Sequence, residues 1–178
     1  MKFEQLCHLI RAATAISEET EFVIIGSQSI LGSWPDAPAE LLVSEEIDAW
    51  PLHRPDLADL LDGSIGELSP FHETFGYYLQ GVGPETAVLA PGWRDRLVRV
   101  THPSMGGGTA FCLDPVDLLA AKCAAGREKD LAFVQVALRS GRVGVATVES
   151  RIMELETTPE VRQRALVLLR RAQAIRFP

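Results

Sequence analysis

Apolar residues recur with two different periods along the chain, and these periods predict helices and strands. Near the N-terminus the apolar positions lie three or four residues apart, which predicts an amphipathic helix over roughly residues 2–16. The polar run SEET at residues 17–20 ends this helix. Its inward face consists of Phe3, Leu6, Leu9, Ile10 and Ala13.

Two short strands are predicted next. The apolar run Phe22–Ile25 ends at Gly26, which is typical of a buried strand that runs into a turn. A helix can begin over Ser27–Leu31, before a loop rich in glycine and proline. Ile47–Trp50 forms the second strand, and Pro51 stops it.

The middle of the chain mixes helices and strands. Arg54–Leu61 has helical spacing. The stretch at residues 66–80 predicts a further helix that starts at Pro70, with Ser69 as its N-cap. We expect strands at Thr86–Ala90, Arg96–Thr101 and Thr109–Leu113, of which the last two form a hairpin.

The remaining elements are all predicted helices. Asp114 is an N-cap, Pro115 occupies the first turn, and the helix continues to about Ala125. Gly126 can end it. The helices that follow are Arg127–Leu138, Thr147–Leu155 and Pro159–Ile175.

This order of elements predicts an α/β or α+β fold in which a mixed central sheet packs on helices. We expect a single domain over residues 1–178, with a core at about 20–140 and a helical tail at about 147–177. The chain is long enough for one domain with a substantial core.

Composition and charge limit the classes of function that the protein can have. Hydrophobic residues make up 47% of the chain, and no apolar run is long enough for a membrane span. We find no secretory signal, and three widely spaced cysteines fit a reducing cytoplasm. Residues 1–90 carry a formal charge of -12 and residues 91–178 carry +5. Nonspecific coating of nucleic acid is therefore not expected, although a basic C-terminal face can meet phosphates.

Two segments of the first half are candidates for chemistry. Gly26 and Ser27 follow a buried strand, where a glycine lets a ligand approach the backbone and a helix start offers N–H groups to phosphate. Glu46 and Asp48 point to one face of a strand, and such paired carboxylates suit a hard cation like Mg²⁺. Alternatively, the first segment is an ordinary turn and the second an exposed polar face.

The third candidate segment is LDPVDLLAAKCAAGREKD at 113–130. Lys122 is the only charged residue between Asp117 and Gly126, so it either extends to solvent or serves an anion. Lys129 would share its face if the helix continued through Gly126. The alternative is an ordinary charged helix end. The four histidines have no metal-ligand spacing, so we expect no catalytic histidine.

Together these segments resemble the nucleotidyltransferase fold of the DNA polymerase beta superfamily. That family has a strand, Gly-Ser, a helix, and then a strand with two carboxylates one residue apart, here Gly26, Ser27, Glu46 and Asp48. The stretch at 113–130 is similar to the corresponding region of bacterial nucleotidyltransferase-like proteins, including abortive-infection and toxin–antitoxin toxins. The resemblance spans roughly residues 20–140. The chain departs from the family in having Glu46 where Asp is usual and a longer gap after Ser27.

The resemblance implies a transfer of a nucleotidyl group from a nucleoside triphosphate to a hydroxyl of RNA, a protein or a small molecule. Glu46 and Asp48 would hold Mg²⁺, and Gly26 and Ser27 would cradle the outer phosphates. Lys122 or Lys129 would neutralise the leaving pyrophosphate. Asp130 is the expected third carboxylate, and an antitoxin-like protein is the expected partner.

Two alternatives remain at this point. One is the same fold without catalysis, acting as a nucleotide-binding or protein-interaction module, which Glu46 and the long gap favour. The other is an unrelated α+β fold.

Overall fold

The computed structural model describes residues 1–174, and the contacts divide the chain into two units. The sheet unit combines residues 1–86 with residues 97–113. The helical unit combines residues 87–96 with the chain from residue 114 onward. The expectation of one single domain stays a prediction. No helix of the described residues is long and apolar enough to cross a membrane.

The sheet unit is built on a five-stranded mixed sheet, which confirms the predicted α/β class. The strand order is β3-β2-β1-β5-β4, so the predicted first strand is central. β1 pairs antiparallel with β2 and parallel with β5, and β4 and β5 form the predicted hairpin. The strands are β1 (Glu21–Ile25), β2 (Glu46–Pro51), β3 (Tyr78–Gly81), β4 (Val98–Thr101) and β5 (Thr109–Cys112).

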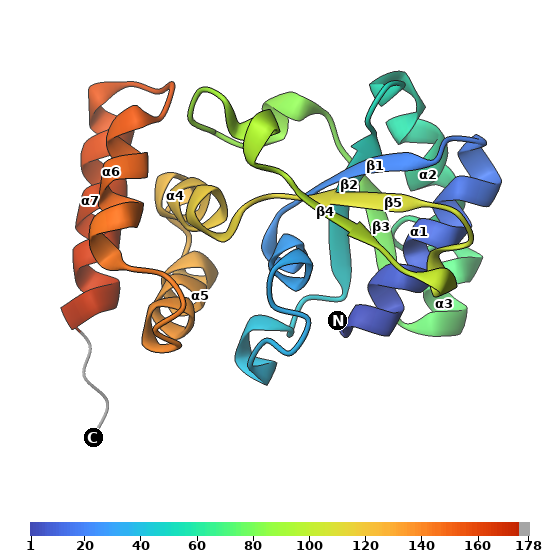
Figure 1. Ribbon diagram of the computed structural model, residues 1–178, viewed down its shortest axis with the longest axis horizontal. Coiled ribbons are helices and arrows are strands. Elements are labelled where there is room, and N and C mark those ends of the chain that lie inside the picture. Colours follow the sequence, from blue (N-terminus) through green and yellow to red (C-terminus); the bar gives the residue numbers. More distant parts are fainter. Residues whose placement is uncertain (175–178) are drawn as a thin grey trace. The chain divides into compact units, whose positions relative to one another are not determined.

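One face of this sheet carries helices, as the close contacts at its glycines demonstrate (Figure 1). A Cβ on Gly81 would lie 2.0 Å from the carbonyl oxygen of Ala58, in helix α2. A Cβ on Gly108, just before β5, would lie 2.6 Å from Ile10, in helix α1. Strand pairing puts Gly81 and Gly108 on one face of the sheet, so α1 and α2 cover that face. The helices of this unit are α1 (Phe3–Ser17), α2 (Ala58–Ile65) and α3 (Pro70–Phe75).

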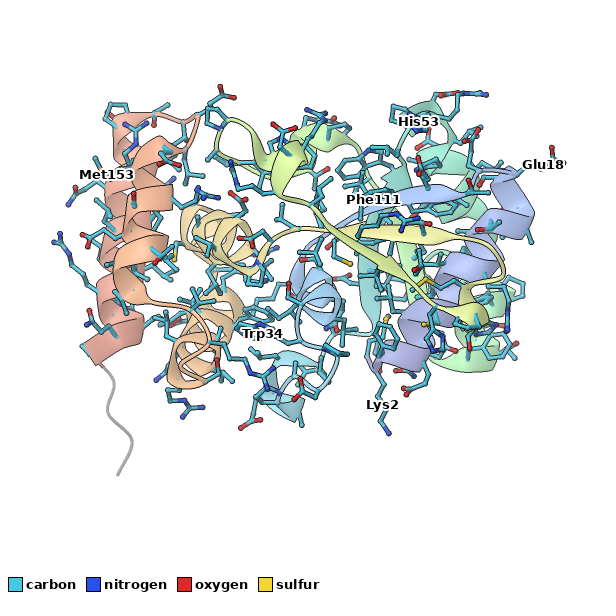
Figure 2. All side chains as sticks on the ribbon, in the orientation of Figure 1. Lys2, Glu18, Trp34, His53, Phe111 and Met153 are labelled. Atoms are coloured by element: carbon cyan, nitrogen blue, oxygen red, sulfur yellow. The ribbon has the colours of Figure 1, made fainter. Side chains whose placement is uncertain are left out.

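The opposite face of the sheet carries a different set of residues. Because neighbouring residues of a strand alternate between faces, Val23 and its partners across the sheet, Trp50 and Phe111, lie on this second face. Figure 2 labels Phe111 on β5. Glu46 and Asp48 lie on the same face, four and two residues before Trp50 on β2. The acidic pair is therefore on the face opposite to α1 and α2.

Two predictions for the middle of the chain are wrong. The helix that starts at Pro70 does have Ser69 as its N-cap, with the Ser69 hydroxyl accepting from the amide of His72 at 3.1 Å. It ends at Phe75, however, because Gly76 adopts a left-handed φ of 74°, and Tyr78–Gly81 is strand β3. Thr86–Ala90 is not a strand. Thr86 ends a 3-10 turn (Pro84–Thr86), and residues 87–90 have no regular secondary structure.

The helical unit contains four described helices that pack on one another (Figure 1). Asp114 caps the first of them as predicted, with its carboxylate accepting from the amides of Val116 and Asp117. Gly126 ends that helix with a φ of 73°. The tail predicted to Ile175 is helical to Ala174, and Ile175 lies outside the described residues. The helices are α4 (Pro115–Ala125), α5 (Glu128–Arg139), α6 (Val145–Glu154) and α7 (Pro159–Ala174).

A buried carboxylate joins three parts of this unit. Asp117 in α4 is 1% exposed. It accepts hydrogen bonds from Arg96 through Nε at 2.7 Å and Nη2 at 3.0 Å, and from Nη1 of Arg151 in α6. Because a buried charge is stable only when it is paired, this network fixes residues 87–96 to α4 and α6.

Candidate active site

The Gly26–Ser27 turn leaves the central strand of the sheet. β1 is fully buried from Phe22 to Ile25, which holds the start of the turn rigidly. Gly26 has a φ of 69°, a conformation that side chains disfavour, and Ser27–Gly32 forms a short 3-10 helix rather than an α-helix. The Gly26 carbonyl accepts from the hydroxyl of Ser29 at 2.8 Å, which closes the turn.

Glu46 and Asp48 lie on the neighbouring strand, beside this turn. Asp48 pairs with Ile25, the last residue of β1. The alternating residues Ile47 and Ala49 are 0% exposed, whereas both acids are partly exposed. The two carboxylates therefore lie on one face of β2, as the alternation along the sequence predicts.

The Asp48 carboxylate lies directly against Gly26. A Cβ built on Gly26 would be 1.8 Å from Oδ2 of Asp48, far inside van der Waals contact. Position 26 therefore requires glycine for two reasons: its φ is positive, and a carboxylate lies close to its backbone. The turn and the acidic strand thus form one site in the sheet unit.

Tyr78 belongs to this site, and sequence reasoning missed it. Its hydroxyl donates to Oε2 of Glu46 at 2.9 Å, across the paired positions of β3 and β2. Burial, followed by the hydrogen bond to Glu46 and nearby negative charges, raises the pKa of Tyr78 well above its usual value. The hydroxyl is therefore protonated at neutral pH and holds the Glu46 side chain in one orientation.

Lys122, Asp130 and Lys129 are placed in the helical unit. Lys122 is 5% exposed, its Nζ lies 3.2 Å from Oδ1 of Asp130, and it lies 4.5 Å from the ring centroid of Phe133. Because α4 ends at Gly126, Lys129 lies on α5 and is exposed. The face that Lys122 and Lys129 would share on one continuous helix therefore does not exist.

Asp130 is fully buried among cations. Arg127 donates to it from Nε at 2.7 Å and from Nη2 at 3.1 Å, in addition to the contact from Lys122. Burial by itself would raise the pKa of Asp130, but the hydrogen bonds from Arg127 and the charge of Lys122 outweigh it and lower the pKa. These contacts make Asp130 the counter-charge of Lys122 and Arg127, and its role as a third carboxylate stays a prediction.

The lowered pKa of Asp130 predicts an acid-dependent contribution to stability. An ionised Asp130 stabilises the fold above its unfolded pKa of about 3.9, and this contribution is lost as the pH falls through the lower folded pKa. The Tm difference between wild type and Asp130→Asn should therefore be constant above about pH 5 and shrink below about pH 4. Thermal melts at a series of pH values measure this Tm difference, and Glu128→Gln is the control because Glu128 is exposed. A difference independent of pH would contradict the prediction.

The acidic pair fits a hard divalent cation. Mg²⁺ prefers carboxylate oxygens, keeps several waters, and is commonly held by one or two carboxylates together with substrate phosphates. Within residues 1–174 no group of three or more His, Cys, Asp or Glu side chains could hold a metal ion. Glu46 and Asp48 stay the predicted protein ligands.

Each of the four histidines contacts neighbouring side chains or backbone, and the expectation of no catalytic histidine stays a prediction. His53 lies 2.9 Å from Glu21 at the surface of the sheet unit (Figure 2), and His8 hydrogen-bonds the Tyr77 hydroxyl at 2.8 Å. His72 packs against the Tyr78 ring, 4.6 Å between centroids. The ring of His102 accepts from the amide of Ser104 at its own turn.

A Gly26→Ala variant tests the close approach of Asp48. We expect a loss of stability and weaker binding of Mn²⁺, because the new methyl group displaces the Asp48 carboxylate. Gly76→Ala is the matched control, since Gly76 has a similar φ of 74° and nothing within 4 Å of the added Cβ. The control should lose only the ~1 kcal/mol of a left-handed residue. The site would be contradicted if Gly26→Ala lost no more stability than Gly76→Ala and bound Mn²⁺ as tightly as the wild type.

Of the comparisons with known proteins, one finds a family for this chain. A protein-family model described as "Nucleotidyltransferase of unknown function (DUF6036)" matches residues 1–175. No curated protein and no solved structure matches the chain significantly. The family match covers almost the whole chain, including the turn, the acidic strand and the C-terminal helices. The chain therefore belongs to this family of nucleotidyltransferases and has a nucleotidyltransferase-like fold.

Proposed function

We propose that the protein transfers a nucleotidyl group from a nucleoside triphosphate to a hydroxyl acceptor, with a divalent cation, Mg²⁺, at Glu46 and Asp48. One observation carries the proposal: the Asp48 carboxylate lies against the Gly26 turn, with Glu46 on the same strand face. This arrangement puts two hard oxygen ligands beside a turn that can approach phosphates closely.

Each residue has a proposed role in this reaction. The bound cation would neutralise charge on the triphosphate. Glu46 and Asp48 hold it, and Tyr78 fixes the orientation of Glu46. The backbone of Gly26 and the Ser27 hydroxyl bind the outer phosphates.

The acceptor oxygen forms a bond to the α-phosphorus while the bond to the β-phosphate oxygen breaks. Pyrophosphate leaves with that oxygen, and the proton of the acceptor hydroxyl is released to solvent. Lys122 or Lys129 neutralises charge on the leaving pyrophosphate. Asp130 orients Lys122 through their contact at 3.2 Å.

The test is transfer of label from an α-labelled nucleoside triphosphate. The purified protein is incubated with each of the four triphosphates and separate pools of RNA, protein and small-molecule acceptors, with Mg²⁺ or with EDTA. We expect label in one acceptor pool, with Mg²⁺ only. Label that persists in EDTA would contradict the metal role, and absence of transfer from every triphosphate would contradict the activity.

A non-catalytic nucleotide-binding module is the second candidate function. It is favoured by Glu46, whose longer side chain is held by Tyr78, and by the counter-charge contacts of Asp130. Metal-dependent triphosphate binding without transfer would support it. The toxin-like role, the antitoxin-like partner and the cytoplasmic location remain predictions from the resemblance and the composition.

Tyr78→Phe tests the orientation of Glu46. Removing the hydroxyl leaves the ring and its packing on His72 in place but releases the Glu46 carboxylate. We expect Mn²⁺ affinity and transfer to fall about tenfold, the usual size of a hydrogen bond to a charged group, with little change in Tm. Tyr77→Phe is the control, because the Tyr77 hydroxyl bonds His8 instead. An unchanged metal affinity would show that Tyr78 does not position a ligand.

A further inference from the structure

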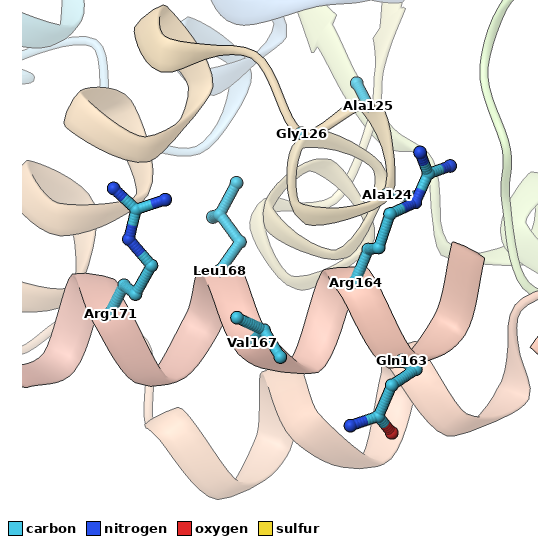
Figure 3. A pocket seen from close by; sticks show the side chains of 8 residues that line it. All are labelled: Ala124, Ala125, Gly126, Gln163, Arg164, Val167, Leu168 and Arg171. Atoms are coloured by element: carbon cyan, nitrogen blue, oxygen red, sulfur yellow. The ribbon is translucent and has the colours of Figure 1, made fainter. Parts of the chain in front are cut away.

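A pocket of about 290 Å³ lies in the helical unit, between the end of α4 and one face of α7 (Figure 3). Its floor is apolar, with small side chains from α4 and two aliphatic side chains from α7. Its rim carries two guanidinium groups and one amide. The lining residues are Ala124, Ala125, Gly126, Gln163, Arg164, Val167, Leu168 and Arg171.

The two arginines are placed to bind separate anionic groups. Arg164 and Arg171 are seven residues apart on α7, which is two helical turns, so they lie on one face at a spacing of about 10 Å along the axis. Figure 3 shows both side chains rising from α7 with Leu168 between them. Both residues are exposed, and Arg171 lies 4.0 Å from Glu128, a long ion pair at the surface. One phosphate is too small to fill this span, whereas two phosphates of one strand fit it.

The charge of the chain favours a polyanion at this place. The helical unit has 13 Lys and Arg against 9 Asp and Glu, whereas the sheet unit has 4 against 15. Residues 161–171 contain four arginines and no acid. Guanidinium groups bind phosphate oxygens in pairs, and the apolar floor between them suits a ribose or the face of a base.

We propose that this pocket binds two phosphates of a single-stranded nucleic acid, through Arg164 and Arg171. This assignment goes beyond the proposed function and stands on the helical unit alone. Gln163, at the rim, can donate and accept hydrogen bonds at a base edge.

The experiment measures binding of a fluorescently labelled single-stranded RNA by anisotropy over a range of salt concentrations. The variants are Arg164→Gln and Arg171→Gln, and the matched control is Arg170→Gln, an exposed arginine of the same helix outside the pocket lining. We expect each pocket variant to weaken binding about tenfold and the control less than about twofold. The salt slope should fall by about 0.7 for each pocket arginine removed.

Several outcomes would overturn the proposal. Equal weakening by Arg170→Gln would mean diffuse attraction to α7 rather than a pocket. If a mononucleotide displaced the labelled RNA as well as an unlabelled strand does, at equal phosphate concentration, a strand would be excluded as the specific ligand. Equal competition by an acidic peptide would assign the pocket to a protein partner. No RNA binding by the wild-type protein would exclude the site altogether.

Asp48→Asn separates this proposal from the proposed function. This variant should lose metal binding and transfer but keep the RNA affinity of the wild type, because Asp48 does not line the pocket. RNA affinity that falls with Asp48→Asn as much as with Arg164→Gln would overturn the pocket, whereas transfer that fails in the wild type would overturn only the proposed function.

Discussion

Asp48→Asn is expected to reduce nucleotidyl transfer by about a hundredfold or more, since electrostatic and metal interactions carry most of such a reaction. Asparagine has nearly the same shape, so the contact with the Gly26 turn remains while the charge is lost. Removing one of two neighbouring carboxylates also relieves the repulsion between their like charges. The loss should therefore appear in Mn²⁺ affinity and transfer, with Tm unchanged or slightly higher.

Glu45→Gln is the matched control for this variant. Glu45 directly precedes β2 and is exposed, and the alternation along the strand turns it away from Glu46. Glu45→Gln removes the same charge as Asp48→Asn, from nearly the same position in the chain. Calorimetric titration with Mn²⁺ compares the two variants, and equal affinities of Asp48→Asn and wild type would remove Asp48 from the metal site.

Asp117→Ala is expected to cost roughly 3–5 kcal/mol of stability, the usual effect of removing one member of a buried ion pair. Without the carboxylate, Arg96 and Arg151 both lose their buried counter-charge, and Arg151 keeps its ion pair with the more exposed Glu154. Residues 87–96 would then lose their attachment to α4 and α6. Chemical denaturation measures the free energy of unfolding.

Asp95→Ala is the control for Asp117→Ala. Asp95 lies in the same attached segment, next to Arg96, and is exposed. It should change stability by less than about 0.5 kcal/mol, as surface substitutions usually do. A cost at Asp117 as small as that at Asp95 would mean that the network contributes no net stability.

The best-predicted part of the site lies where local pattern and tertiary position agree. The apolar run Phe22–Ile25 is central and buried, because only a central strand buries both faces of such a run. Glu46 and Asp48 share a face because strand residues alternate. Ser69 and Asp114 cap helices because their oxygens accept from free amides at the next residues.

The wrong and missing predictions arise where local pattern is ambiguous. Tyr78–Gly81 is too short to show a period, and it follows a real helix start at Pro70, so the local pattern predicts a helix that continues through it. The run Thr86–Ala90 has strand-forming residues but no strand partner in the structure. Strand formation depends on pairing across the sheet, which residues distant in sequence supply.

Local patterns in the sequence are enough to predict most of the helices, the two central strands, the Gly26–Ser27 turn and the common face of Glu46 and Asp48. Each follows from a period or a cap that spans only a few residues. The folded structure was needed to show that Tyr78 holds Glu46, that Asp48 lies against Gly26, and that Asp130 pairs with the buried Lys122. These contacts depend on strand register and helix packing, which bring together residues whose separation along the chain carries no local signal.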